Sequence, residues 1–207
     1  VVNCPTSSTV DEDLASYVSA GLFEVVSTGN DIPLIDLAHD SSRQIVVDWE
    51  RDQYLGHPSS VLLEDGRTIL IVYPKGHGKG AIVMKRSTDG GLTWSQRLPV
   101  PENWATSKET PTIYRVVDAA GKRRLILFSG LYPVRMAVSE DDGRTWTELE
   151  PIGEYGGIVA VSSVVRLKDG RYMALFHDDG RFLRNSGKRA ETMTVYKILS
   201  EDGGLTW

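Results

Sequence analysis

Short apolar runs, each bounded by polar turns, recur along residues 51–207. The runs are four to six residues long and rich in β-branched and aromatic side chains, which is typical of strands that pack face to face. A turn of the Asp-Gly kind at 64–67 separates two such runs and predicts a hairpin. A third run follows after a loop, and the same order occurs three times. The expected strands are 58–63, 68–73 and 81–86, then 112–117, 124–128 and 135–138, then 161–167, 172–176 and 192–199.

Each third strand is followed by an octet of fixed pattern, Ser-x-Asp-x-Gly-x-Thr-Trp, and the copies start 52 and 61 residues apart. A repeat of this period predicts a repeat architecture in which neighbouring units share a core. Asp and Ser bond nearby backbone groups, Gly accepts positive φ, and Trp offers an apolar face, so we expect a tight turn. The fixed positions are Ser87, Asp89, Gly91, Thr93 and Trp94; Ser139, Asp141, Gly143, Thr145 and Trp146; and Ser200, Asp202, Gly204, Thr206 and Trp207.

The octet resembles the Asp box of sialidases, or neuraminidases, and of related BNR-repeat β-propellers. This resemblance covers residues 51–207. It implies an all-β, sialidase-like β-propeller of which about three four-stranded blades are present. Because propellers close with about 4 to 8 blades, we expect the chain to be a fragment of a longer, six-bladed protein. In that family the Asp boxes lie away from the active site, so we expect a structural role for all three.

Residues 1–50 do not share the repeated pattern, and within them residues 44–48 are expected to form a strand. In sialidase-like propellers an N-terminal strand completes the last blade, and the resemblance implies this role here. We therefore divide the chain into an N-terminal segment, 1–50, with a closing strand, and a partial propeller, 51–207.

The composition argues against some classes of partner, but it does not determine the cell compartment. Charged residues make up 25% and apolar ones 41%, and the net charge is −5, so a nucleic-acid partner is not expected. No stretch approaches the roughly 18 to 20 apolar residues of a membrane span. The single Cys4 excludes an internal disulfide but leaves the compartment open, and we favour a secreted or periplasmic location over the cytoplasm.

Polar side chains gather at one end of the expected blades, where the first strand starts and the second strand leads into the third. Loops from several blades converge at this end in a propeller, which favours a ligand site there. Arg and Lys bind carboxylates, so the cations predict an acidic sugar as the partner. The binding candidates are Arg51, Tyr54, Lys75, Lys79, Glu109, Arg135, His177, Asp178, Asp179 and Arg181.

Two histidines are the catalytic candidates, because imidazole transfers protons near neutral pH. His77 lies between glycines and lysines in a loop, which favours a functional role, whereas His57 taken alone reads as a structural residue before Pro58. The run 177–179 fits a carboxylate-oriented histidine, a metal site or a turn, and the pattern is too weak to predict a metal. No cofactor is expected.

The resemblance to sialidases is incomplete at the site. Sialidases begin their first blade with an aromatic-Arg-Ile-Pro run, and residues 54–58 here read Tyr-Leu-Gly-His-Pro, without the arginine. No Asp or Glu lies between Asp65 and Asp89, where the family carries its acid/base aspartate. The family's nucleophilic tyrosine and its glutamate partner are expected beyond Trp207. The leading hypothesis is a sialidase-like glycoside hydrolase, and the alternatives are a propeller lyase, a His-dependent glycosidase or a non-catalytic carbohydrate-binding propeller.

Overall fold

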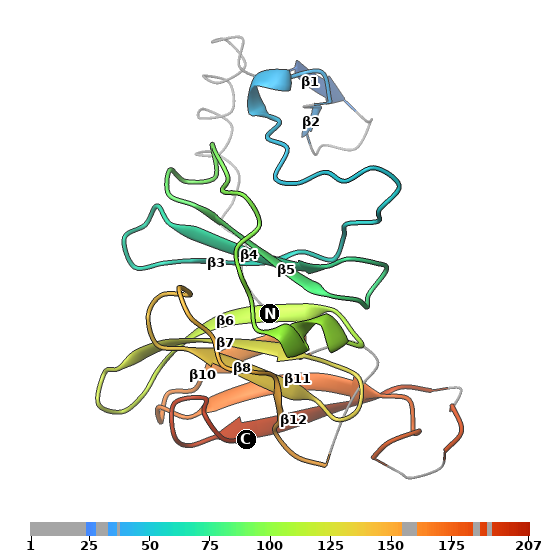
Figure 1. The fold of residues 1–207 in the computed structure, drawn as a ribbon, viewed down its shortest axis with the longest axis vertical. Helices are drawn as coiled ribbons and strands as arrows, with labels where there is room; N and C mark the ends of the chain where they lie inside the picture. Colours follow the sequence, from blue (N-terminus) through green and yellow to red (C-terminus); the bar gives the residue numbers. More distant parts are fainter. Residues whose placement is uncertain (1–23, 28–32, 37, 155–160, 184–186, 190–191) are drawn as a thin grey trace. The chain divides into compact units, whose positions relative to one another are not determined.

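A computed structural model describes residues 24–27, 33–36, 38–154, 161–183, 187–189 and 192–207 (Figure 1). The chain forms two compact units, Val1–Val46 and Val47–Trp207. In the first unit, strand β1 (Glu24–Ser27) pairs antiparallel with β2 (Pro33–Asp36), and a short 3-10 helix η1 (Ser41–Arg43) follows.

The second unit consists of three antiparallel sheets, which Figure 1 shows stacked in chain order. This arrangement confirms the all-β prediction and is consistent with propeller blades. The first sheet holds β3 (Ser59–Leu62), β4 (Ile69–Pro74) and β5 (Ile82–Ser87). The second holds β6 (Pro111–Val117), β7 (Arg123–Ser129), β8 (Arg135–Ser139) and β9 (Glu150–Pro151). The third holds β10 (Ser163–Arg166), β11 (Tyr172–Asp178) and β12 (Thr194–Ser200).

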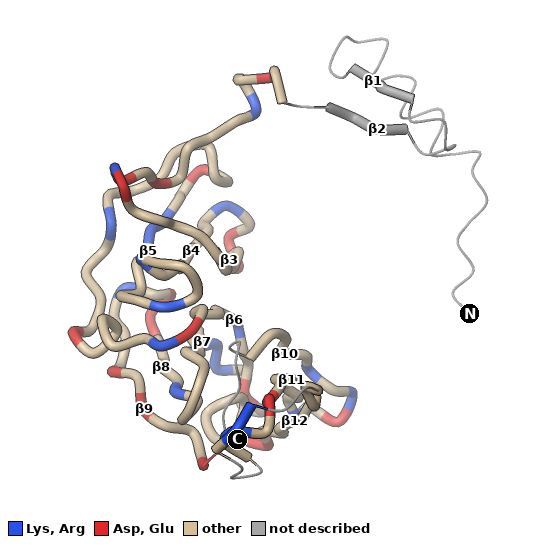
Figure 2. Tube along the Cα trace, turned by 90° about the vertical axis from the view of Figure 1, so that its right-hand side faces the viewer, with Lys and Arg blue, Asp and Glu red and all other residues tan. Residues whose placement is uncertain are grey.

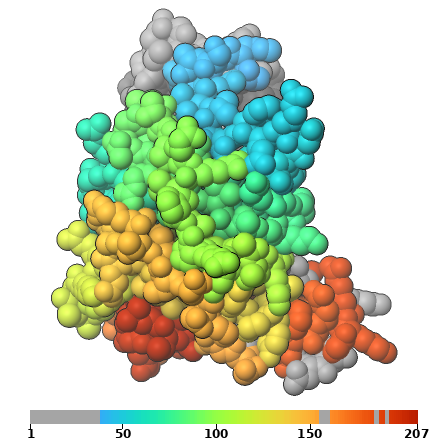
Figure 3. Space-filling model, viewed as in Figure 1, coloured from blue at the N-terminus to red at the C-terminus, as the bar shows by residue number. Residues whose placement is uncertain are grey.

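The prediction of four strands per sheet holds only for the second sheet. In the first sheet, Ser95 N donates to Arg86 O and Leu98 N donates to Met84 O, both at 2.8 Å. The outer segment therefore follows β5 without forming a continuous ladder. Between the first two sheets runs a 3-10 helix that the sequence did not indicate, η2 (Glu102–Thr106), which lies on the surface near their boundary in Figure 3.

The strand expected at residues 44–48 is absent, and that prediction is wrong. Residues 47–50 instead run across the first sheet through side-chain contacts, because Val47 O accepts a hydrogen bond from Lys85 Nζ and the Asp48 carboxylate binds Arg97. These residues belong to the second compact unit, which begins at Val47.

Apolar side chains fill the two interfaces between the three sheets. Alternate residues of β4 and β5 face β6, β7 and β8 across the first interface, with Trp104 of η2 fully buried beside them. Alternate residues of β7 and β8 face β10, β11 and β12 across the second. This two-residue period is what the apolar runs predicted.

The three Asp boxes form one turn repeated with closely matching bond lengths. In each copy the serine Oγ accepts a hydrogen bond from the backbone N of the glycine at the fifth position, at 2.8 Å. The aspartate accepts from the threonine N at 2.9 Å and from the threonine Oγ1 at 2.6 Å. The serine and aspartate side chains thus make the same hydrogen bonds within each eight-residue box.

The second and third boxes each pack on the sheet that precedes them. Gly143 of the second box lies against Leu70 of the first sheet. Trp207 of the third box meets Phe128 of the second sheet edge-on, with ring centroids 5.6 Å apart. The indoles of all three boxes are half-buried. Trp146 packs on the core between the first two sheets and Trp207 on the core between the second and third, whereas Trp94 belongs to neither.

No helix among the residues described is long and apolar enough to cross a membrane.

Candidate functional site

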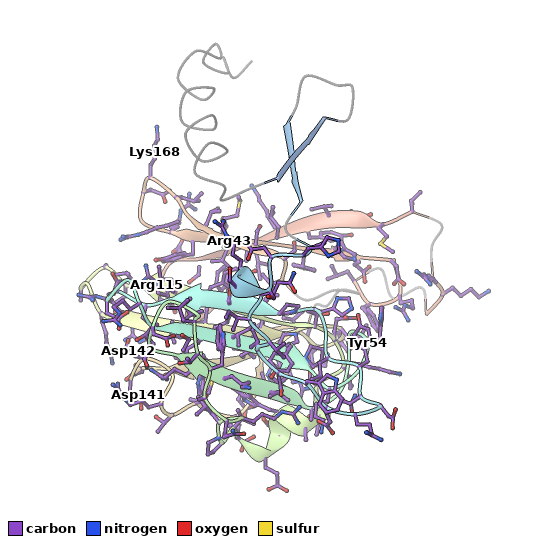
Figure 4. The ribbon with its side chains drawn as sticks, turned by 90° about the horizontal axis from the view of Figure 1, so that it is seen from above. Arg43, Tyr54, Arg115, Asp141, Asp142 and Lys168 are labelled. Atoms are coloured by element: carbon purple, nitrogen blue, oxygen red, sulfur yellow. The ribbon has the colours of Figure 1, made fainter. Side chains whose placement is uncertain are left out.

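The two ends of the stacked sheets carry different kinds of connection between strands. Figure 4 shows Tyr54 at one end, and Arg115, Asp141 and Asp142 at the other. The hairpin turns and the Asp boxes occupy the second end, since Gly90 N of the first box donates to Arg67 O of the first turn. We call the end that carries Tyr54 the loop end. It holds the loops 75–81 and 130–134 and the described residues among 179–193, which join the second and third strands of the sheets.

At the loop end of the first sheet, Tyr54, His57 and His77 form a cluster of three rings. The His57 and His77 rings meet edge-on, with centroids 4.7 Å apart and planes at 86°. The Tyr54 ring lies 5.2 Å from His77 and 6.1 Å from His57. All three side chains are exposed, so they are open to a ligand from solvent.

The backbone brings the two histidines together from segments 20 residues apart in the sequence. An isolated bridge joins Leu55 to Lys75, and Lys75 N donates to Ala81 O at 2.9 Å, which closes the loop that carries His77. Gly80 has φ of 114°, and a Cβ there would collide with the carbonyl oxygen of Lys75. The tight loop therefore depends on a glycine at that position.

His57 has φ of 52°, in the left-handed region that residues other than glycine rarely occupy. It also precedes Pro58, and a proline restricts the residue before it. Beside it, the Tyr54 ring lies over Gly56, where a Cβ would come within 2.6 Å of the ring. Strained backbone of this kind persists where the surroundings hold it and is concentrated at functional sites.

Several of the expected ligand-binding cations are engaged within the protein. Lys75 Nζ lies 3.0 Å from both carboxylate oxygens of Glu50. Arg135 donates from Nη1 and Nη2 to the Thr106 side chain and carbonyl, both at 2.8 Å. Within the described chain, Arg51 and Lys79 make no ion pair and are exposed.

Glu109 belongs to the same group as His77. Its Oε1 would lie 3.0 Å from a Cβ at Gly78, next to His77, and accepts a hydrogen bond from Thr110 N at 3.0 Å. Glu109 thus brings a carboxylate to the loop that carries His77.

Sequence reasoning missed the ionic network behind this cluster. Arg97 donates from Nε to Asp48 at 2.7 Å and from Nη1 to Glu50 at 2.6 Å. Tyr73 OH donates to the same Asp48 carboxylate. Hydrogen bonds from Arg97 and Lys75 lower the pKa of Glu50, whereas burial and then the bond to Asp48 raise the pKa of Tyr73. No local pattern marks the network, because its partners lie 25 to 49 residues apart.

The acidic run of the third sheet forms a separate group. Asp178 and Asp179 are both buried, and Asp178 accepts from Gly180 N at 2.7 Å. Asp179 pairs with Arg181 at 2.8 Å and with Arg189 at 3.6 Å. Burial, the largest single influence, raises the pKa of Asp179. The hydrogen bonds and positive charge of Arg181 together outweigh it, so the pKa of Asp179 is lowered.

The third sheet does not orient His177 through Asp178. Successive residues of a strand point to opposite faces, and His177 is half-buried where Asp178 is buried. Of the three interpretations of residues 177–179, the geometry favours the turn. The described residues bring no three His, Cys, Asp or Glu side chains together in a group that could hold a metal ion.

The contacts therefore join Tyr54, His57, His77 and Glu109 at the first sheet, and Asp178, Asp179 and Arg181 at the third. A stacked pair, Tyr132 and Phe182, connects the loops of the second and third sheets, with centroids 5.2 Å apart. Among the residues that the structure describes, no contact joins the first group to the second, and Arg135 binds Thr106 of η2.

Stacked antiparallel sheets that carry an Asp box in each repeat define the class of sialidase-type BNR propellers. The chain matches the BNR repeat-like domain over residues 37–207, and it belongs to this family.

The chain is also similar in fold to a crystal structure described as an unknown function protein from Dyadobacter fermentans DSM 18053. The identity is 14%, and the TM-score is 0.54. The match covers 79% of this chain and 56% of that one, so the chain spans little more than half of the length of its structural relative. No curated protein matches the chain.

Proposed function

We propose that the chain contributes part of a sialidase-like glycoside hydrolase site for an acidic sugar, centred on Tyr54, His57 and His77. The observation that carries the proposal is the edge-on contact of the two imidazoles, 4.7 Å between centroids, on exposed loops. Family membership supports a carbohydrate partner loosely, because the family includes sialidases.

In this proposal His77 is the acid/base residue. Imidazole exchanges protons near neutral pH, and the loop of His77 occupies the place where sialidases carry an aspartate. His77 protonates the glycosidic oxygen as the bond to the anomeric carbon breaks, and then takes a proton from the attacking water. His57 holds the His77 ring edge-on, and the Tyr54 ring lies tilted beside both.

The carboxylate of the acidic sugar is assigned to Arg51 and Lys79. Both are exposed and make no ion pair within the described chain, unlike Lys75. A cation that is not paired internally can bind an external carboxylate without first losing a partner. Arg135 and Arg181, both bound within the protein, are less suited to this role.

A second candidate function is carbohydrate binding without catalysis. The observation that favours it is the internal pairing of Lys75 and Arg181, which leaves few free cations for a substrate carboxylate. An exposed tyrosine beside imidazoles also suits the stacking of a sugar ring.

The experiment measures turnover of the intact protein with sialyllactose and with uronic-acid oligosaccharides. His77→Ala is expected to lower kcat by about 10² to 10⁴, with folding intact, and His77→Asp to restore part of the loss. His39→Ala, a change at an exposed histidine of the other unit, is the matched control and keeps full turnover.

Wild-type turnover from His77→Ala rules out the acid/base role. Binding of these sugars by a wild-type protein that has no turnover supports the second candidate instead.

A further inference from the structure

Trp49 is exposed over 72% of its surface, although it lies between two residues, Asp48 and Glu50, that form ion pairs. It forms one wall of an open cleft of about 450 Å³ on the outer side of the first sheet. The cleft is lined by Asp48, Trp49, Glu50, Lys85, Gln96 and Arg97. This volume lies within the range of small-molecule sites, about 300 to 1,000 Å³.

The polar wall of the cleft is fixed in place before any ligand binds. Arg97 donates to both Asp48 and Glu50, at 2.7 and 2.6 Å. Asp48 also accepts from Trp49 N at 2.8 Å, which holds the backbone that carries the indole. A preorganised wall lowers the entropic cost of binding.

The charges of the cleft balance one another. Two carboxylates and two cations line it. Arg97 pairs with Asp48 and Glu50, and Lys85 lies 3.9 Å from Asp48, so each of the four charges has a partner of opposite sign. A charged ligand would have to displace one of these pairs. A neutral ligand with many hydroxyl groups can add hydrogen bonds to them, because each carboxylate oxygen has a second lone pair.

We propose that this cleft binds a neutral saccharide, stacked on Trp49 and hydrogen-bonded to Glu50, Gln96 and Arg97. The indole supplies a flat apolar face for the C–H groups of a sugar ring, and the amide of Gln96 both donates and accepts. The cleft differs in chemistry from the histidine cluster, to which an acidic sugar is assigned. Tyr54, His57 and His77 are not among the residues that line the cleft.

The test titrates the intact protein with lactose, cellobiose, maltose and N,N′-diacetylchitobiose, followed by saturation-transfer NMR. At least one disaccharide is expected to bind with a dissociation constant on the order of 1 mM. Trp49→Ala weakens that binding at least about tenfold, whereas Trp49→Tyr, which keeps an aromatic face, retains most of it.

Leu92→Ala is the matched control, because Leu92 is also exposed, over 67% of its surface, but lies in an Asp box. It leaves binding unchanged. His77→Ala likewise leaves this binding unchanged, so the cleft and the proposed catalytic site fail or succeed separately.

Absence of binding by all four disaccharides, or binding that survives Trp49→Ala, overturns the proposal. Weak quenching of Trp49 fluorescence by acrylamide also overturns it, because it means that another part of the protein covers the indole.

Discussion

The Asp-box end and the loop end of the same three sheets are built in opposite ways. At the Asp-box end, one set of hydrogen bonds recurs three times, with partners at most four residues apart. At the loop end, the described side chains differ from one sheet to the next, and the contacts join distant segments, as with Glu50 and Lys75. Figure 2 shows that acidic and basic residues are interspersed along this unit. The end whose contacts repeat thus has a structural role, and the end whose contacts vary carries the candidate functional residues.

The strongest test of this contrast is Gly203→Ala in the third Asp box. A Cβ there would lie 2.6 Å from the Asp118 Cα of the second sheet, and φ is 80°. Overpacking and left-handed strain together should lower the free energy of unfolding by about 2 to 4 kcal/mol, measured by urea denaturation.

Gly90→Ala is the matched control, because Gly90 holds the same place in the first box with φ of 77° and nothing within 4 Å of an added Cβ. Only the strain remains, so the loss should be about 1 kcal/mol. Equal losses at the two positions would show that the box does not depend on the preceding sheet.

Acid should weaken the Asp boxes as their carboxylates become protonated. Hydrogen bonds from Thr93 hold the pKa of Asp89 at about 2, and those from Thr206 hold the pKa of Asp202 at about 2 against the opposing effect of burial. A depressed pKa in the folded state means that the stabilisation is complete above about pH 4 and is lost as the pH falls towards 2.

The measurement is the melting temperature between pH 5 and pH 2, compared with carboxyl chemical shifts of the same samples. Asp202→Asn should give a shallower fall than the wild type. A melting temperature that stays constant over this range would contradict the hydrogen-bonded carboxylates.

The smallest expected effect is at the loop end. His57→Gly removes the left-handed strain at φ of 52° but adds backbone freedom to the unfolded chain, so stability should change by at most about 1 kcal/mol. Turnover or sugar binding should fall with it. A variant that keeps full function would show that the His57 conformation serves only the backbone.

The sequence predicted the sheets and the turns because their determinants are local. Alternation of apolar residues and the octets act over a few positions, as the match of β4 and β11 to their expected ranges shows. The pairing of Lys75 with Glu50 and of Arg135 with η2 depends on how distant segments fold together. The spacing of residues in the sequence does not reveal whether an Arg or Lys side chain is already paired with another residue of the protein. The prediction of a strand at 44–48 failed for the same reason, since Lys85 and Arg97 bind its last two residues, Val47 and Asp48, through side chains.

The second and third boxes each pack against the sheet that precedes them in the chain, through Gly143 and Trp207 respectively. Each repeat of this kind therefore carries the residues that attach it to the preceding sheet, and the preceding sheet needs no change to receive it. Duplication of one stretch of gene therefore adds a blade that is already fitted to its neighbour. The loops at the other end are then free to diverge, copy by copy, without disturbing that attachment.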